Sequence, residues 1–324
     1  MSNRDIVVEN LVKQYGSFKA VDDVSFKVQS GEIFGFLGPN GAGKSTTVSI
    51  MTTLALPTAG RALVGGYDVV SEAADVRRVA GVALQEIGLD PLMKSMEMLT
   101  IQGQMFGMTR KQAQGRAREL LDLVKLSEFT DRLVGKYSGG MRRRLDLALA
   151  LVHEPAILFL DEPTTGLDPA SRRDIWAEVR RLNKQQGMTI FLTTQYLEEA
   201  DELADRVAII DHGKIAAMGA PADLKAALGG ESINVTFRDL DEVEKAANEL
   251  REMANRTQTD RKVLRLYLDR AAAAVPTVVT RLQQAGLEPL SLTLTQPTLD
   301  DVFLQVTGQR FDAPTEDEAE TQAA

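Results

Sequence analysis

A strand that runs directly into a glycine-rich turn and a helix restricts the fold of this chain more than any other feature. The segment "EIFGFLG" is apolar at nearly every position, which is typical of a parallel strand buried on both faces of a sheet. The octet "GPNGAGKS" (Gly38–Ser45) follows it, and "KSTTVSIMTTLA" then predicts a helix. The glycines let the backbone amides of Gly41, Gly43 and Lys44 turn inward around an anion, and the helix N-terminus adds a favourable dipole. The pattern therefore predicts a phosphate-binding loop.

This loop assigns specific contacts to a bound nucleotide. We expect Lys44 to reach the β- and γ-phosphates and the Ser45 hydroxyl to ligate Mg²⁺. Further candidate contacts within and directly after the loop are Gly38, Asn40 and Thr46. A flexible glycine turn is the alternative interpretation, but it explains neither the buried strand before the loop nor the helix after it.

Two adjacent carboxylates at the end of another buried strand provide the acidic groups that a nucleotide site needs. Asp161 and Glu162 close the segment "AILFLDE". In a parallel sheet, this strand end lies at the same edge as the phosphate-binding loop. We expect Asp161 to hold magnesium, directly or through water, and Glu162 to act as the general base on the attacking water.

The composition narrows both the chemistry and the surroundings. The 324 residues, 44% of them hydrophobic, suffice for a large core and a second, smaller domain. The absence of cysteine excludes disulfides, thiolate metal sites and a cysteine nucleophile, and two histidines are too few for a multi-histidine metal centre. A net charge of −9 argues against nonspecific binding to nucleic acid. Apolar runs stay well below the roughly 20 residues that span a bilayer, and "MSNRDIVVEN" has no apolar signal region. We expect a cytoplasmic protein that reaches a membrane only through a partner.

The predicted elements follow an α/β order with a helical insertion. Short alternating strands precede the phosphate-binding loop, over about residues 5–37. After the strand "RVAGVALQ", residues 89–135 favour helices and contain no convincing strand. The strands "AILFLDEP" and "MTIFLTT" then alternate with helices, and "RVAIIDHGKIAAMG" predicts a hairpin.

A change of character near Gly229 predicts a second domain. The segments from "SINVTF" to "PLSLTLTQ" follow a βαβαβ order, which indicates a small α+β fold, and "TLDDVFLQVTG" predicts a short helix after it. The acidic tail "FDAPTEDEAETQAA" is expected to be disordered. We therefore divide the chain into a nucleotide-binding domain (1–228) with a helical subdomain at about 86–140, a small C-terminal domain (229–310) and a tail (311–324).

With these motifs in this order, residues 5–225 resemble the ATP-binding cassette (ABC) ATPases. The resemblance implies a mixed-sheet core, an antiparallel β subdomain and a helical subdomain. The segment "YSGGMRRR" is similar to the family's signature motif, usually Leu-Ser-Gly-Gly-Gln, with tyrosine and methionine as the outer residues. Ser138, Gly139 and Gly140 keep the hydroxyl and the bare amides that suit an anion at a helix N-terminus. The resemblance implies that they bind the γ-phosphate held by the phosphate loop of a second copy, so that ATP joins two chains head to tail.

The resemblance also implies roles for three residues whose types alone say little. Gln85 resembles the glutamine that senses Mg²⁺ and the attacking water and that links to the membrane partner. Tyr15 resembles the aromatic residue that stacks on adenine, and Asp168, in "TGLDP", resembles the loop that crosses the dimer interface. The alternatives are a solvated glutamine, a core or surface tyrosine and an ordinary Asp-Pro turn.

Gln195 is an informative departure from the family pattern. Most members place a histidine after "TT", where it contacts the γ-phosphate and helps to orient water, whereas this chain reads "TTQYLEEAD". Glutamine keeps a donor and an acceptor but cannot hold a proton. We expect Gln195 to bind the γ-phosphate as a neutral contact and Glu162 to carry the base role with less help.

This glutamine, "YSGGMRRRLDLA" and the late "QPTLDDVFLQVTG" together resemble one branch of the family, the ATP-binding subunits of daunorubicin/doxorubicin-resistance-type drug exporters. The resemblance implies an ATP- and Mg²⁺-dependent hydrolase, peripheral on the cytoplasmic face of the cell membrane. Its implied partners are a second copy and a separate integral membrane permease, and its implied cargo is a hydrophobic drug, natural product or lipid. The alternatives are a soluble ABC ATPase acting on nucleic acid or ribosomes, a small-molecule kinase and a nonhydrolytic ATP switch.

Two remaining features favour structure over a separate activity. The run Arg142–Arg144 could bind nucleic acid, but in a chain of net charge −9 we expect pairing within the protein and solvated charge. The methionine-rich insertion between Met93 and Met108 is either core packing or an adaptable docking face for the membrane subunit.

Overall fold

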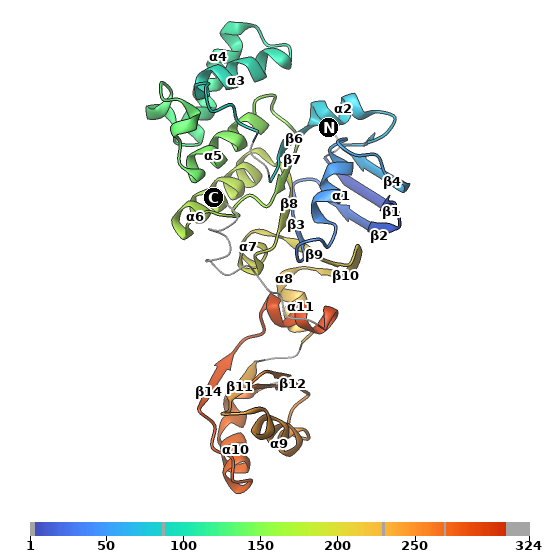
Figure 1. Cartoon of the computed structure of the whole chain (residues 1–324), viewed down its shortest axis with the longest axis vertical. Helices are drawn as coiled ribbons and strands as arrows, with labels where there is room; N and C mark the ends of the chain where they lie inside the picture. The colour runs from blue at the N-terminus through green and yellow to red at the C-terminus, as the bar shows by residue number, and fades with distance from the viewer. Residues whose placement is uncertain (1–3, 86–87, 229–230, 269, 309–324) are drawn as a thin grey trace. The chain divides into compact units, whose positions relative to one another are not determined.

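The structure, a computed structural model, describes residues 4–85, 88–228, 231–268 and 270–308. These residues form two compact units that divide between Gly219 and Ala220 (Figure 1). Across the described part of the chain, every helix is too short or too polar to pass through a lipid bilayer. The predicted acidic tail lies outside the described residues.

A six-stranded sheet forms the centre of the first unit. Its strand order is β10-β9-β3-β8-β7-β6, with bounds β3 (Ile33–Leu37), β6 (Ala80–Ala83), β7 (Ile157–Asp161), β8 (Thr189–Thr194), β9 (Arg206–Asp211) and β10 (Lys214–Gly219). All neighbours are parallel except the β9–β10 hairpin. Every residue of β3, β7 and β8 is buried, which confirms the strands predicted from their continuous apolar runs.

The two faces of this sheet support two separate cores. Successive side chains of a strand point to opposite faces. On one face Phe34, Phe159 and Phe191 pack toward α1 (Lys44–Met51), and the ring centroids of Phe34 and Phe191 lie 5.7 Å apart. On the other face the neighbouring aliphatic residues of the same strands pack with α4 (Arg110–Leu123), α5 (Gly139–Ala150) and α6 (Pro169–Gln186). Figure 1 accordingly shows α1 and α5 on opposite sides of β3, β7 and β8.

An antiparallel sheet covers the α1 side. Its order is β2-β1-β4-β5, with bounds β1 (Ile6–Tyr15), β2 (Phe18–Val28), β4 (Ala59–Val64) and β5 (Tyr67–Asp68). The β1–β2 hairpin was predicted from its alternation, whereas β4, β5 and the short helix α2 (Ala73–Val79) were not. These elements span few residues and offer little periodicity, because much of their sequence is Gly, Ala and Val.

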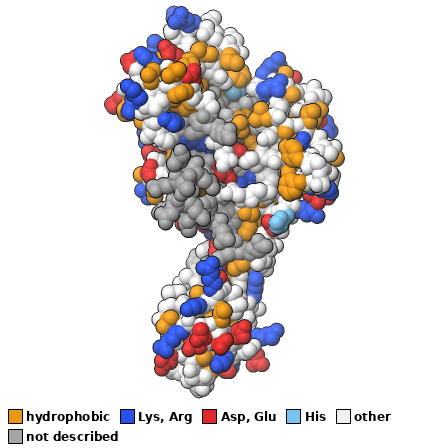
Figure 2. All heavy atoms as spheres, viewed as in Figure 1, with side chains coloured by type: hydrophobic (Ala, Val, Ile, Leu, Met, Phe, Trp, Pro, Cys, Tyr) orange, Lys and Arg blue, Asp and Glu red, His pale blue; other side chains and the backbone are white. Residues whose placement is uncertain are grey.

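The insertion between β6 and β7 is helical, as predicted. It contains α3 (Ser95–Met105), α4 (Arg110–Leu123), two short 3-10 turns (Ser127–Phe129 and Val134–Lys136) and α5 (Gly139–Ala150). Met96, Met98 and Met108 pack against the core, so core packing explains most of the methionines. Met105 is 77% exposed and Ile101 is 48% exposed. Figure 2 shows hydrophobic side chains among charged ones on the surface of this region.

Two helices complete the first unit on the same face of the central sheet as α5. Helix α6 (Pro169–Gln186) follows β7, and α7 (Leu197–Leu203) follows β8. Asp168 caps α6 by accepting from the backbone amides of Ala170 and Ser171, and proline occupies its first turn.

The second unit is a four-stranded antiparallel sheet with helices. Its chain order is β11 (Ser232–Thr236), α9 (Leu240–Leu250), β12 (Arg256–Asp260), β13 (Val263–Tyr267), α10 (Ala271–Gln284) and β14 (Ser291–Thr295). The strands lie in the order β12-β13-β11-β14. The short helices α8 (Pro221–Ala226) and α11 (Leu299–Thr307) belong to the same unit. The α+β fold is as predicted, but βαβαβ becomes βαββαβ because the polar segment "RTQTD" forms β12.

We expect Gly81→Ala to destabilise the first unit. A Cβ at Gly81 in β6 would lie 2.3 Å from the carbonyl oxygen of Ala150 and 2.8 Å from Pro155 Cγ, so backbone has to shift. The free energy of unfolding should fall by about 1–3 kcal/mol in urea titrations. In the control Gly115→Ala, on α4, the new Cβ meets no atom within 4 Å. That variant should gain roughly 0.5–1 kcal/mol, and an equal loss in both variants would contradict the steric argument.

Candidate functional site

The phosphate-binding loop joins β3 to α1 and needs glycine for two reasons. Gly41 and Gly43 have φ values of 79° and 107°, in the left-handed region that side chains avoid. A Cβ at Gly43 would also lie 2.3 Å from the carbonyl oxygen of Ala20, and one at Gly38 would lie 2.4 Å from that of Ile210. Neighbouring strands therefore press directly on the loop backbone.

A pocket of about 440 Å³ opens at this loop. Its volume falls in the range of small-molecule sites. It is lined by Tyr15, Phe18, Ala20, Asn40, Gly41, Gly43, Lys44, Ser45, Thr46, Gln85 and Glu162. Four stretches far apart in the sequence (15–20, 40–46, 85 and 162) thus meet there, and most of the predicted nucleotide contacts are among these residues.

Lys44 lies inside the loop and faces Glu162. Its Nζ donates to the carbonyl oxygens of Gly38 (2.8 Å) and Pro39 (3.1 Å) and lies 3.2 Å from Glu162 Oε1. The lysine is only 4% exposed, and burial lowers its pKa while the Glu162 carboxylate raises it. The result is a cation held where a triphosphate would enter.

Asp161 and the Ser45 hydroxyl are adjacent, as a shared magnesium site requires. Ser45 Oγ donates to Asp161 Oδ1 at 3.2 Å, and Thr193 Oγ1 donates to the same oxygen at 2.5 Å. A carboxylate beside a hydroxyl is a donor set that Mg²⁺ accepts in proteins, usually together with water and phosphate oxygens.

Glu162 is the point where the other polar groups converge. Its Oε2 accepts from Gln85 Nε2 (3.3 Å), Thr165 Oγ1 (3.2 Å) and Gln195 Nε2 (3.5 Å). Its φ of 49° is a left-handed conformation that costs a non-glycine residue about 1–3 kcal/mol. Such strain at a buried carboxylate is typical of a functional position, and it turns the side chain toward Lys44.

An exposed aromatic pair marks one wall of the pocket. Tyr15 and Phe18 pair across the turn of the β1–β2 hairpin, and they are 53% and 62% exposed. Phe18 was not predicted as a site residue. The signal was available, since "YGSF" places two aromatic residues on either side of a two-residue turn. Planar exposed rings at this position suit stacking on a nucleobase.

Ser138, Gly139 and Gly140 are not among the described residues that line this pocket. Ser138 caps α5, and its Oγ accepts from the backbone amide of Met141 at 3.3 Å. Asp168 is exposed at the start of α6, and hydrogen bonds from Ser171 lower its pKa. A Cβ on Gly140 would lie 2.9 Å from Ser171 Oγ, so the two helix starts are neighbours. They form a second surface apart from the phosphate-binding loop.

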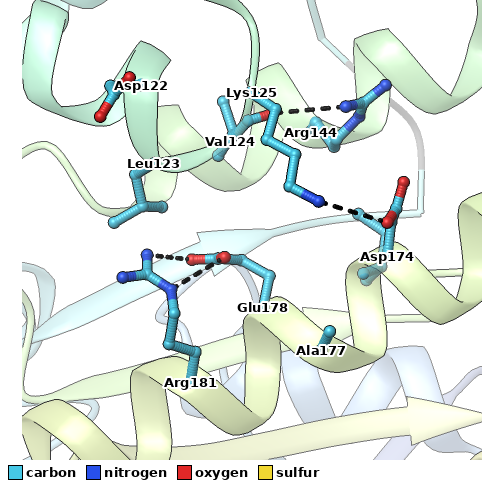
Figure 3. Close-up of a pocket in the computed structure, with 10 residues that line it drawn as sticks. Asp122, Leu123, Val124, Lys125, Arg144, Asp174, Ala177, Glu178 and Arg181 are labelled. Atoms are coloured by element: carbon cyan, nitrogen blue, oxygen red, sulfur yellow. Dashed lines mark hydrogen bonds and ion pairs between the residues drawn. The ribbon is translucent and has the colours of Figure 1, made fainter.

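A further hollow, of about 380 Å³, lies between α4, α5 and α6 (Figure 3). Four of the charged side chains that line it form two ion pairs. Lys125 Nζ lies 3.5 Å from Asp174 Oδ1, and Arg181 Nη2 lies 2.6 Å from Glu178 Oε1. The predicted site residues are not among the described residues that line it, so we assign no chemistry to it.

Glu199 is a buried acid that the sequence analysis did not single out. Its Oε1 accepts from Thr164 Oγ1 (3.0 Å) and Trp176 Nε1 (2.8 Å). It therefore ties α7, just after Gln195, to α6 and to the loop after Glu162. Burial raises its pKa, and hydrogen bonds from Thr194, Trp176 and Thr164 oppose that rise. The sequence carried no signal, since "LEEAD" resembles any charged helix.

Comparisons with known proteins agree with this geometry. A family model described as ABC transporter matches residues 21–165, and one described as ATP-binding protein DrrA1-3-like, C-terminal domain, matches residues 219–307. Daunorubicin resistance ATP-binding protein DrrA3 of Streptomyces coeruleorubidus is 44% identical over 308 residues, covering 95% of this chain and 97% of the relative. Nod factor export ATP-binding protein I of Burkholderia pseudomallei is 40% identical over 313 residues, covering 96% and 99%.

Solved structures support the fold of the first unit. A dimeric post-hydrolysis state of the ATP-binding cassette MJ0796, bound to ADP and Pi, matches with a TM-score of 0.61 and 26% identity, covering 66% of this chain and 98% of that one. The chain therefore belongs to the ABC transporter family, as an ATP-binding ATPase. Within the family, it is similar over almost its full length to the daunorubicin/doxorubicin resistance ATP-binding proteins, which confirms the predicted branch.

We expect Glu199→Gln to make stability less dependent on pH. A raised pKa means that the folded state favours the protonated carboxyl, so this contribution to stability is present at low pH and is lost as pH rises through the folded-state pKa. Glutamine copies the protonated form. The melting temperature of the variant relative to the parent should therefore be higher at about pH 8.5 than at about pH 5. Glu198→Gln is the control because Glu198 is exposed. If the difference in melting temperature between Glu199→Gln and the parent were the same at both pH values, this account would be contradicted.

Proposed function

We propose that this chain is the ATP-hydrolysing subunit of an exporter whose membrane-spanning part is a separate protein. The proposed cargo is a hydrophobic drug, natural product or lipid, and the proposed location is the cytoplasmic face of the cell membrane. The relatives named for daunorubicin resistance and Nod factor export support this assignment. The exposed apolar side chains Ile101 and Met105 on α3 offer a surface for the membrane partner.

The separation of the two phosphate-binding features is the observation that carries the mechanism. Lys44 and Ser45 line the pocket, whereas Ser138, Gly139 and Gly140 begin a helix on the other side of the central sheet. One chain therefore holds two half-sites. We propose that two copies associate head to tail, so that each serine-glycine-glycine segment completes the pocket of the other. Asp168, beside Gly140, then lies in the contact between copies.

Within the completed site, the residues of this chain have distinct roles. Asp161, Ser45 and Gln85 would hold Mg²⁺, which supplies charge neutralisation on the phosphate oxygens. Lys44 binds the phosphates, and Tyr15 stacks on the base. Glu162 accepts the proton of the attacking water, and Gln195 donates to the γ-phosphate from its place beside Glu162. Closure and opening of the pair shift the membrane subunits between two conformations.

The domain division remains part of this proposal. We assign nucleotide binding to the domain predicted at residues 1–228, although the compact units divide earlier, between Gly219 and Ala220. The helical subdomain at about 86–140 is proposed to receive the membrane subunit. The small domain (229–310) is assigned a regulatory or dimer-stabilising role, separate from the acidic tail (311–324).

Glu162→Gln should trap an ATP-bound dimer. The variant keeps the shape of the base but cannot accept the proton of water, so hydrolysis should fall by about 10²–10⁴-fold. ATP binding should persist, and light scattering should show a dimer that forms only with MgATP. Lys44→Ala should lose nucleotide binding, and it should therefore show no MgATP-dependent dimer by light scattering. Glu119→Gln, an exposed change on α4, should behave like the parent. Normal hydrolysis by Glu162→Gln would remove Glu162 from its role.

Gln195→Ala should weaken hydrolysis without abolishing it. The change removes one neutral donor beside Glu162, and loss of such a contact costs about 1–3 kcal/mol, or roughly 5–150-fold in turnover. Gln195→His should restore part of the loss because it returns the residue usual in the family. Steady-state ATPase assays would measure both, and unchanged ATP affinity and turnover in Gln195→Ala would rule out the proposed contact.

A further inference from the structure

Arg143 is a buried cation that none of the roles above uses. It lies on α5, five residues after Ser138, and is 5% exposed. Its neighbours in the arginine run differ. Arg142 is exposed and donates to the carbonyl oxygen of Gly135 at 3.1 Å, and Arg144 makes long contacts of 3.4–3.5 Å within the helical region. Pairing within the protein, expected for the whole run, is therefore concentrated at its middle residue.

The guanidinium of Arg143 donates to three backbone carbonyl oxygens in two segments of the chain. Its Nε donates to the carbonyl oxygen of Pro163 at 2.9 Å, and its Nη2 donates to that of Asp161 at 2.7 Å. Its Nη1 donates to the carbonyl oxygen of Leu84 at 2.5 Å. The same nitrogen lies 3.3 Å from Asp146 Oδ2, one turn along α5.

Those three carbonyls belong to the residues next to the catalytic side chains. Asp161 and Pro163 stand on either side of Glu162, and Leu84 directly precedes Gln85. The strained backbone of Glu162 is thus held from both flanks by one side chain. The fixed fork of the guanidinium suits this task, since a lysine ammonium is a single point of charge on a flexible stem.

The charge of Arg143 is compensated where it lies. Burial lowers its pKa, while Asp146, Asp161, Glu199 and Glu162 raise it. Three carbonyl dipoles and a carboxylate surround the guanidinium, which is the environment that a buried cation needs. The buried guanidinium thus connects the helix that Ser138 caps to the backbone on both sides of Glu162.

We infer that Arg143 is a positioning residue that aligns Glu162 and Gln85 with the helix that begins at Ser138. This inference rests on the proposed function. A nucleotide bound to Ser138 belongs to the partner's pocket, whereas Glu162 serves the pocket of its own chain. Arg143 therefore couples the position of Glu162 in one pocket to nucleotide binding at Ser138, which belongs to the other pocket. Through this contact the two sites can act together.

The first test separates turnover from binding. Arg143→Lys keeps the charge and loses the fork, so Glu162 and Gln85 should be less well placed. We expect kcat for ATP hydrolysis to fall by about tenfold or more, with the dissociation constant for ATP changed by less than about threefold. Arg142→Lys, the exposed neighbour, should match the parent in both measurements. Unchanged kcat in Arg143→Lys, or equal losses in both variants, would overturn the inference.

The second test asks whether Arg143 acts through Glu162. In a Glu162→Gln background, Arg143→Lys should cause little further loss of turnover, because the group that it aligns is already disabled. Multiplicative losses would mean that Arg143 acts elsewhere. If Arg143→Lys fails to fold, Arg143→Gln with Asp146→Asn replaces the pair with neutral groups and leaves no buried charge unpaired. The same loss of kcat with retained ATP affinity is expected from that double variant, and parental kcat in it would overturn the inference.

The outcome also distinguishes this inference from the function on which it rests. If the unmodified chain neither dimerises with MgATP nor hydrolyses it, the proposed function fails. If it does both, and Arg143→Lys hydrolyses ATP at the parental rate, only the positioning role fails.

Discussion

The contact between Lys44 and Glu162 is the interaction on which the rest of the site depends. The two ionised side chains lie 3.2 Å apart and are almost wholly buried. Each would be costly alone, so they stabilise one another and fix the distance between the phosphate-binding loop and the end of β7. Gln85 and Gln195 then add hydrogen bonds to the same carboxylate. The electrostatics of the pocket are thus set before a nucleotide arrives, which is how a site avoids reorganising during the reaction.

The central sheet determines why one chain is incomplete. Alternation along β3, β7 and β8 gives each strand two apolar faces, and each face recruits its own helices. The phosphate loop enters α1 on one side, and Ser138 starts α5 on the other. The geometry that makes the core stable therefore keeps these two helix starts apart. In the function proposed above, association of two copies brings them together.

Much of the fold and of the candidate site was predictable from the sequence. The elements and residues that were not predicted share a cause. Continuous apolar runs identified the buried strands, and the loop octet with Asp161 and Glu162 identified the pocket. Strands β4 and β12 were missed because neither "AGRALV" nor "RTQTD" shows a clear alternation. Arg143 and Glu199 were not predicted as site residues because their contacts are to groups far along the chain or to carbonyl oxygens, which no residue type reveals. Local patterns predict elements and ligand loops, whereas the supports behind a catalytic side chain emerge only from tertiary packing.

The carbonyl oxygen of Ala20 pressed against Gly43 has a consequence for how such a pocket evolves. The backbone of β2 contacts the phosphate-binding loop so closely at Gly43 that no Cβ fits between them. Tyr15 and Phe18 are open to solvent, so replacing either ring leaves the contact between Ala20 and Gly43 unchanged. With the base stacking proposed for Tyr15, nucleobase preference could change through side-chain replacement at the tip of the β1–β2 hairpin. A foreign hairpin whose backbone follows a slightly different path would instead displace the phosphate-binding loop.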